Sequence, residues 1–128
     1  MTGGIAGIHQ MLGGLVVVAL IVVAILAAFQ AAGRSGDATR IASYVAGALL
    51  VLQYVLGFLL LGSNFRNSNE HYVIALLILV PIGLQHTAAR RLSPQTRGIS
   101  TMIWALAAAF VSVIAYMTGM WGTAAVAS

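Results

Sequence analysis

The chain has 128 residues, of which 61% are hydrophobic and only 6% are charged, and its mean hydropathy is +1.02. This composition excludes an ordinary soluble domain, in which about 45–50% of residues are apolar. The net charge of +4 comes from six arginines spread over short polar segments, so no basic face suited to nucleic acid is expected. The absence of cysteine excludes disulfides, iron–sulfur clusters and thiolate chemistry.

Four apolar runs of about 20 residues follow one another, each long enough to cross the hydrocarbon core of a bilayer. They cover residues 8–30, 41–62, 71–88 and 99–121. Short polar segments join them, which favours an up-down-up-down bundle of antiparallel helices. We therefore predict an all-α integral membrane protein with four transmembrane helices, forming a single domain over residues 1–128. Pro81 lies inside the third run and is expected to bend that helix and to leave the carbonyl of Leu77 without its helical partner.

The arginines indicate how the chain is oriented in the membrane. Five of the six lie in the segments after the first and third runs, and only Arg66 lies between the second and third. The positive-inside rule then places the first and third connecting segments in the cytoplasm and both termini outside, in a bacterial inner membrane. Residues 1–7 contain no lysine or arginine, so we expect the first run to remain as a membrane helix and not to be a cleaved signal peptide.

Two histidines, His9 and His71, open the first and third runs. An ionisable side chain within a membrane segment is costly and is therefore a functional candidate. Both histidines would lie near the outer face, where their neutral rings are suited to be the two axial ligands of one haem iron. The alternatives are interfacial histidines that hydrogen-bond lipid headgroups, ligands of a chlorophyll-type pigment, and ligands of another metal.

The spacing of the histidines recurs in the chain. Among the identical residues separated by 62 positions are His9 and His71, Tyr54 and Tyr116, and Gly57 and Gly119. This coincidence predicts that the first helix pair is repeated as the second, about a pseudo-twofold axis along the membrane normal. Gly57 and Gly119 would then lie at the depth of the histidines, where glycine lets a flat ligand approach the helix backbone.

Three further polar residues have more than one interpretation. Arg66, on the outer side, is either a partner for a haem propionate or simply solvated. Gln53, within the second run, either hydrogen-bonds between helices or lies near the cofactor. His86 follows His71 by about 22 Å along a helix and is expected at the cytoplasmic interface, where no second histidine accompanies it.

The stretch Gln53-Tyr-Val-Leu-Gly57, the outer segment after it and His71 at the next helix start resemble one half of the haem A synthase family. His9 followed by Gly13 and Gly14, with a similar interval to the second histidine, resembles that family as well. The resemblance covers roughly residues 8 to 81. It implies a four-helix haem-binding half-bundle, with the two histidines at the ligand positions and Gly13 among the residues around the haem. The family's acidic residue before the first histidine and its outer-loop cysteine pair have no counterpart in this sequence.

These features predict a membrane b-type cytochrome that binds one bis-histidine haem b near the outer face. We expect it to be an electron-transfer or haem-bearing subunit of a larger respiratory or photosynthetic complex, with other membrane subunits and the lipid bilayer as partners. No catalytic residue is expected. Two alternatives stay open: a cofactor-free structural subunit of such a complex, and a half-size haem-modifying enzyme that is active as a dimer.

The orientation leads to a prediction about the C-terminus. A phosphatase fused after Ser128 should be active and a fluorescent protein fused there should be dark, because five of the six arginines lie on the opposite side. The measurement is the activity of the two fusions in intact cells. An inactive phosphatase together with a bright fluorescent protein would place both histidines on the cytoplasmic side.

Overall fold

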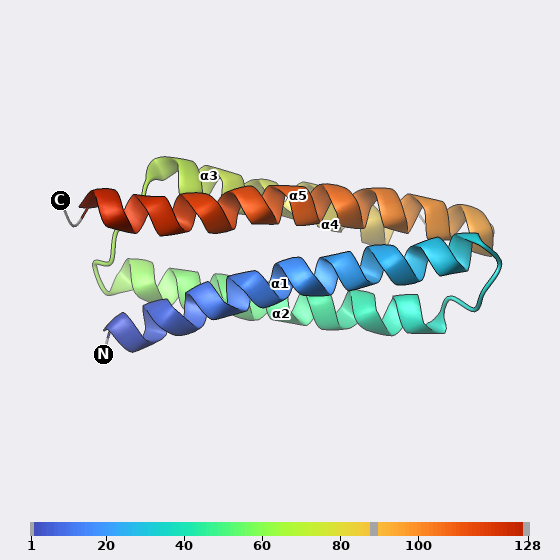
Figure 1. Ribbon diagram of the computed structural model, residues 1–128, viewed down its shortest axis with the longest axis horizontal. Coiled ribbons are helices and arrows are strands. Elements are labelled where there is room, and N and C mark those ends of the chain that lie inside the picture. The colour runs from blue at the N-terminus through green and yellow to red at the C-terminus, as the bar shows by residue number, and fades with distance from the viewer. Residues whose placement is uncertain (1, 88–89, 127–128) are drawn as a thin grey trace.

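The computed structural model describes residues 2–87 and 90–126, with side chains described for residues 3–87 and 90–120. Within these ranges the regular structure is entirely helical. The helices are α1 (Thr2–Ala31), α2 (Asp37–Gly62), α3 (Asn69–Leu77), α4 (Leu79–Thr87) and α5 (Pro94–Val126) (Figure 1). Three of them, α1, α2 and α5, contain stretches long and apolar enough to cross a membrane.

The helices begin several residues before the apolar runs. Asp37 lies in the first turn of α2, where a carboxylate is favourable beside the positive end of the helix dipole. Pro94 opens α5, a position that needs no N–H donor, and the hydroxyl of Ser93 accepts a hydrogen bond from the backbone of Thr96. Hydropathy therefore identifies the apolar part of each helix, whereas the capping residues determine where the helix starts.

The third apolar run forms two short helices, α3 and α4, which are interrupted at Ile78. Pro81 has no N–H to donate to the carbonyl of Leu77, so the helical hydrogen-bond ladder is broken just before it. In the last turn of α3, the carbonyl of Ala75 accepts a hydrogen bond from the hydroxyl of Tyr54 in α2. A neighbouring helix thus supplies a partner next to the interruption. With nine residues each, α3 and α4 are individually too short to cross a bilayer.

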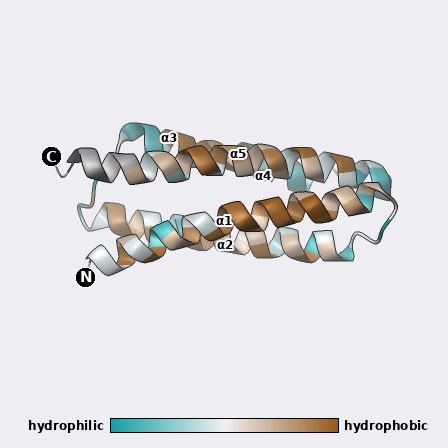
Figure 2. Ribbon diagram, viewed as in Figure 1, coloured by the Kyte–Doolittle hydropathy of each residue, from teal (hydrophilic) through white to brown (hydrophobic). Residues whose placement is uncertain are grey.

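Figure 1 shows α1 beside α2, with α3 and then α4 running along α5. The most extensive packing is that of α1 against α5; α1 also packs against α2, and α3 and α4 each pack against α5. The core consists of buried aliphatic residues, among them Val16, Leu20, Val23, Ala24, Leu50, Ala105 and Ala108. Figure 2 shows that the middle of the bundle is apolar and that the start of α3, the end of α4 and the start of α5 are hydrophilic.

At Gly98, α5 approaches the backbone of α1 closely. A Cβ atom at Gly98 would lie 2.6 Å from the backbone nitrogen of Ala31 and 2.8 Å from the carbonyl oxygen of Ala27. Because both are backbone atoms, no side-chain movement can make room. Small residues at such positions let helices pack tightly within membranes.

We predict that Gly98→Ala lowers the free energy of unfolding by about 1–3 kcal/mol, because the added methyl group forces α1 and α5 apart. Gly47→Ala is the matched control: a Cβ at Gly47 meets no atom within 4 Å, so the change should be neutral or stabilise the helix by up to about 1 kcal/mol. Denaturant unfolding followed by circular dichroism measures both variants. Equal stability of the two variants would contradict the close contact at Gly98.

Candidate functional site

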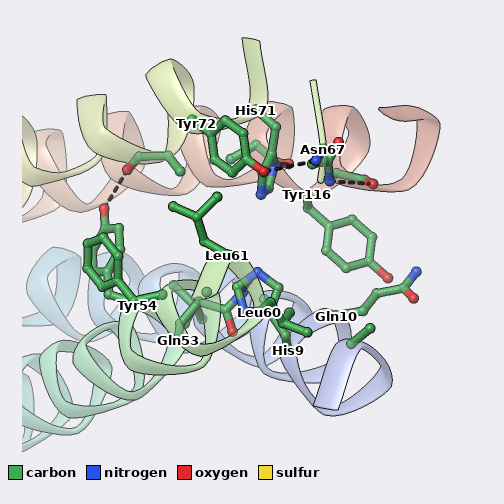
Figure 3. Close-up of a pocket in the computed structure, with 18 of the residues that line it drawn as sticks. His9, Gln10, Gln53, Tyr54, Leu60, Leu61, Asn67, His71, Tyr72 and Tyr116 are labelled. Atoms are coloured by element: carbon green, nitrogen blue, oxygen red, sulfur yellow. Dashed lines mark hydrogen bonds between the residues drawn. The ribbon is translucent and has the colours of Figure 1, made fainter. Parts of the chain in front are cut away.

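A cavity of about 570 Å³ lies between α1, α2, α3 and α5, at the end of the bundle where α1 begins (Figure 3). Its walls are mainly apolar, and its polar side chains include His9, Gln10, Gln53, Asn67 and His71. Pockets that hold small molecules or cofactors have volumes of about 300–1,000 Å³ and combine apolar walls with a few polar groups. The cavity is of this kind.

The side chains of His9, from α1, and His71, from α3, point toward one another across this cavity (Figure 3). The centroids of the two rings are 6.4 Å apart and their planes are inclined at 80°. Two imidazole nitrogens on opposite sides of one metal ion, each at about 2.0 Å, place the ring centroids about 6 Å apart. The observed centroid separation of His9 and His71 is close to this value.

His71 is held by two contacts that leave one ring nitrogen for a ligand. Its backbone N–H donates to the hydroxyl of Ser68, which caps the start of α3. Its ring atom Nδ1 lies 2.9 Å from the carbonyl oxygen of Ala115 in α5, and because a carbonyl only accepts, Nδ1 is the donor. Histidines that bind metals commonly donate their other ring N–H to a carbonyl in this way, which fixes the tautomer and the ring orientation.

The hydrogen bonding of His9 is less complete. Its atom Nε2 lies 3.3 Å from the amide nitrogen of Gln53 in α2. The Nδ1 atom of His9 and the side-chain oxygen of Gln53 are both buried and have no hydrogen-bond partner. Buried polar atoms without partners are costly, so this side of the cavity has unused capacity for a polar or metal-bearing ligand.

Each histidine ring packs against a glycine. A Cβ atom at Gly57 would lie 3.2 Å from Cε1 of His9, and one at Gly119 would lie 3.0 Å from Cε1 of His71. Both glycines also line the cavity. Gly57 and Gly119 therefore leave room for the two rings, in addition to any room that they leave for a flat ligand.

The contacts around the two histidines occur twice, with partners 62 positions apart. The contact of His9 with Gln53 corresponds to that of His71 with Ala115. The contact of His9 with Gly57 corresponds to that of His71 with Gly119. The contact of Tyr54 with Ala75 corresponds to that of Tyr116 with Gly13. Some of these partners are identical residues and others are not: an amide side chain in one half corresponds to a backbone carbonyl in the other. The same positions in the two halves therefore make corresponding contacts, even where the residues at those positions differ.

The remaining residues singled out from the sequence lie in different places. A Cβ atom at Gly13 would lie 3.2 Å from the Gln53 amide nitrogen, so Gly13 is beside the histidine pair. Arg66 is exposed in the segment between α2 and α3 and is not among the residues that line the cavity. His86 lies at the other end of the bundle, where its ring stacks at 6.4 Å on that of Tyr44.

Two groups at the site had no clear signal in the sequence. The side chain of Asn67 donates to the carbonyl of Gly119 at 3.1 Å, and its backbone N–H donates to the hydroxyl of Tyr72 at 2.8 Å, so it fastens the outer segment to α5 and α3. The sequence indicated a polar outer segment but did not indicate that Asn67 makes these two hydrogen bonds. The carbonyl of Ala115 has no signature in the sequence, because every residue has a backbone carbonyl; Ala115 lies 62 positions after Gln53.

Within the described residues, no three or more histidine, cysteine, aspartate or glutamate side chains are grouped so as to hold a metal ion. A metal between His9 and His71 would therefore have to bring its other ligands with it, as the iron of a porphyrin does. No protein-family model, curated protein or solved structure matches the chain. Its function is consequently inferred from the geometry of the histidine pair, the cavity and the membrane helices.

Proposed function

We propose that the chain is a membrane b-type cytochrome in which His9 and His71 are the axial ligands of one haem b. The observation that carries this proposal is the facing pair of imidazole rings, 6.4 Å apart across a mainly apolar cavity. The hydrogen bond from Nδ1 of His71 to Ala115 supports it, because it directs the other ring nitrogen to ligand binding.

The residues of the chain bind and orient the cofactor in this proposal. Gly57 and Gly119 leave space for the ligand rings, and Gln53 adjoins His9. Haem with two histidine ligands supplies a one-electron redox centre when bound. Because both axial positions are then taken, the proposed role is electron transfer and not catalysis on a substrate. Arg66, which is exposed on the same side of the bundle, remains a proposed partner for a propionate.

We further propose that α3 and α4 together form a fourth membrane crossing. Residues 69–87 would extend about 28 Å if the two helices are nearly collinear, which is close to the roughly 30 Å of a hydrocarbon core. An up-down-up-down bundle with a pseudo-twofold repeat of its helix pairs would then result, and the contacts that recur at the 62-residue offset support it. In the bacterial inner membrane, both termini and the haem would lie toward the outer face.

The outward surfaces of the long helices are strongly apolar, with exposed side chains such as Ile21, Phe58 and Phe110. Such surfaces suit contact with lipid and with other membrane helices. We propose that the chain is the haem-bearing subunit of a larger respiratory or photosynthetic complex. The resemblance to half of the haem A synthase family agrees with a haem-binding scaffold, whereas the missing acidic residue gives no support for the synthase reaction.

The proposal predicts about one haem per polypeptide, because one facing histidine pair is present. His9→Ala and His71→Ala should each lose most of the haem, and His86→Ala, at the other end of the bundle, should retain it. Pyridine haemochrome assays of the purified, folded proteins measure the content. A folded wild-type protein without haem would instead favour the cofactor-free structural subunit.

The glycines give a more specific prediction. Gly57→Leu and Gly119→Leu should lose haem almost as completely as His71→Ala, because the added side chain would displace the adjacent histidine ring. Gly47→Leu, which meets open space, should retain it. Haem content and helicity by circular dichroism are measured on each variant. Full haem occupancy in both site variants would show that the glycines are not required for the ligand geometry.

A further inference from the structure

A second cavity, of about 730 Å³, lies at the opposite end of the bundle from the histidine pair and is lined by residues of α1, α2, α4 and α5. Six polar side chains are buried in the described part of the chain, and five of them line this cavity: Gln30, Thr39, Ser43, Gln85 and Thr101. In a protein with so few polar residues, this concentration marks a site that is built for a polar ligand.

The hydrogen bonds of these side chains are only partly satisfied. The amide of Gln85 donates to the hydroxyl of Ser43 at 3.1 Å, and that of Gln30 donates to the carbonyl of Pro94 at 3.0 Å. The side-chain oxygens of Gln85 and Thr39 are buried without a partner. Both residues are only 4% exposed, so these two oxygens cannot be satisfied by the solvent around the bundle.

Three arginines are among the residues that line the cavity. Arg40, Arg90 and Arg97 line it, and the one acidic residue in the lining, Asp37, is paired with Arg40 at 3.2 Å. Arg97 also donates to the carbonyl of Leu92 at 3.2 Å. Arg90 has no acidic counterpart among the described residues that line the cavity. The planar guanidinium group of arginine matches the oxygens of a phosphate, to which it can donate two parallel hydrogen bonds.

We propose that this cavity binds a phosphate ester, supplied by the headgroup of an anionic phospholipid. The phosphate oxygens would accept from the guanidinium group of Arg90, and headgroup hydroxyls would donate to the unpartnered oxygens of Gln85 and Thr39. Ile41 and Val45 directly follow the lining residues Arg40 and Tyr44 in α2 and are exposed, so they offer an apolar surface for an acyl chain. Basic pockets between membrane helices on the cytoplasmic side are typical sites for anionic headgroups. This proposal does not depend on haem binding.

The test is native mass spectrometry of the full chain in detergent, with phosphatidylglycerol or phosphatidylcholine added. Wild-type protein should retain one phosphatidylglycerol and little phosphatidylcholine. Arg90→Gln should reduce the retained phosphatidylglycerol about fivefold, the ratio expected for one interfacial arginine. Arg91→Gln removes the same charge from an exposed neighbour that does not line the cavity, so it should retain the lipid.

Equal retention of the two lipids, or equal loss in the two arginine variants, would overturn the proposal. If glycerol 3-phosphate is retained and phosphatidylglycerol is not, the phosphate site stands and the lipid is overturned as its source. Should Arg90→Gln fail to fold, the melting temperature of the wild-type protein serves as the second measurement. It should rise with phosphatidylglycerol and not with phosphatidylcholine, and an equal rise with both would contradict the proposal.

Discussion

The close packing of α1 against α5 is the contact on which both cavities depend. Lipid tails are as apolar as leucine, so helices within a bilayer are held together by van der Waals packing and hydrogen bonds between them. Gly98 lets the backbone of α5 approach Ala27 and Ala31 of α1, and the alanines of α5 continue the buried layer along the bundle. Because α1 carries His9 and Gln30 near its two ends, this one helix contributes to both polar sites.

Polar side chains are gathered at the two ends of the bundle and separated by an aliphatic core. At one end two imidazole rings face each other, and at the other end amides and hydroxyls are buried beneath arginines. Burial of unpartnered polar groups in apolar surroundings costs free energy, so their confinement to two cavities supports the proposal that each cavity binds a ligand. The two sites differ in chemistry: the first offers metal ligands and the second offers hydrogen bonds and positive charge.

The helical class and the three long apolar helices could be predicted from hydropathy, because a bilayer demands long runs of apolar residues. Hydropathy predicted the helix starts less accurately, because a helix starts at its capping residue, such as Ser93, and not at its first apolar residue. Pro81 predicted a bend in the third run, but the separation into α3 and α4 also involves Tyr54 on another helix, and that contact depends on tertiary packing.

At the site, the 62-residue offset singled out Gly57 and Gly119, and the structure places each against a histidine ring. The sequence could not indicate the carbonyl of Ala115 as a hydrogen-bond acceptor, because every residue has a backbone carbonyl and only the fold selects one of them. Nor could it place Arg66 relative to the cavity, since the path of a short polar segment is set by local bonds such as those of Asn67.

Electron paramagnetic resonance of the oxidised protein tests the central claim most directly, because its signal depends on both axial ligands and on their relative orientation. With His9 and His71 bound to one ferric haem at the observed interplanar angle of 80°, we predict a highly anisotropic low-spin signal. The signal should disappear in His71→Ala. A high-spin ferric haem signal, or a folded protein that contains no haem, would contradict the assignment of these two histidines as axial ligands.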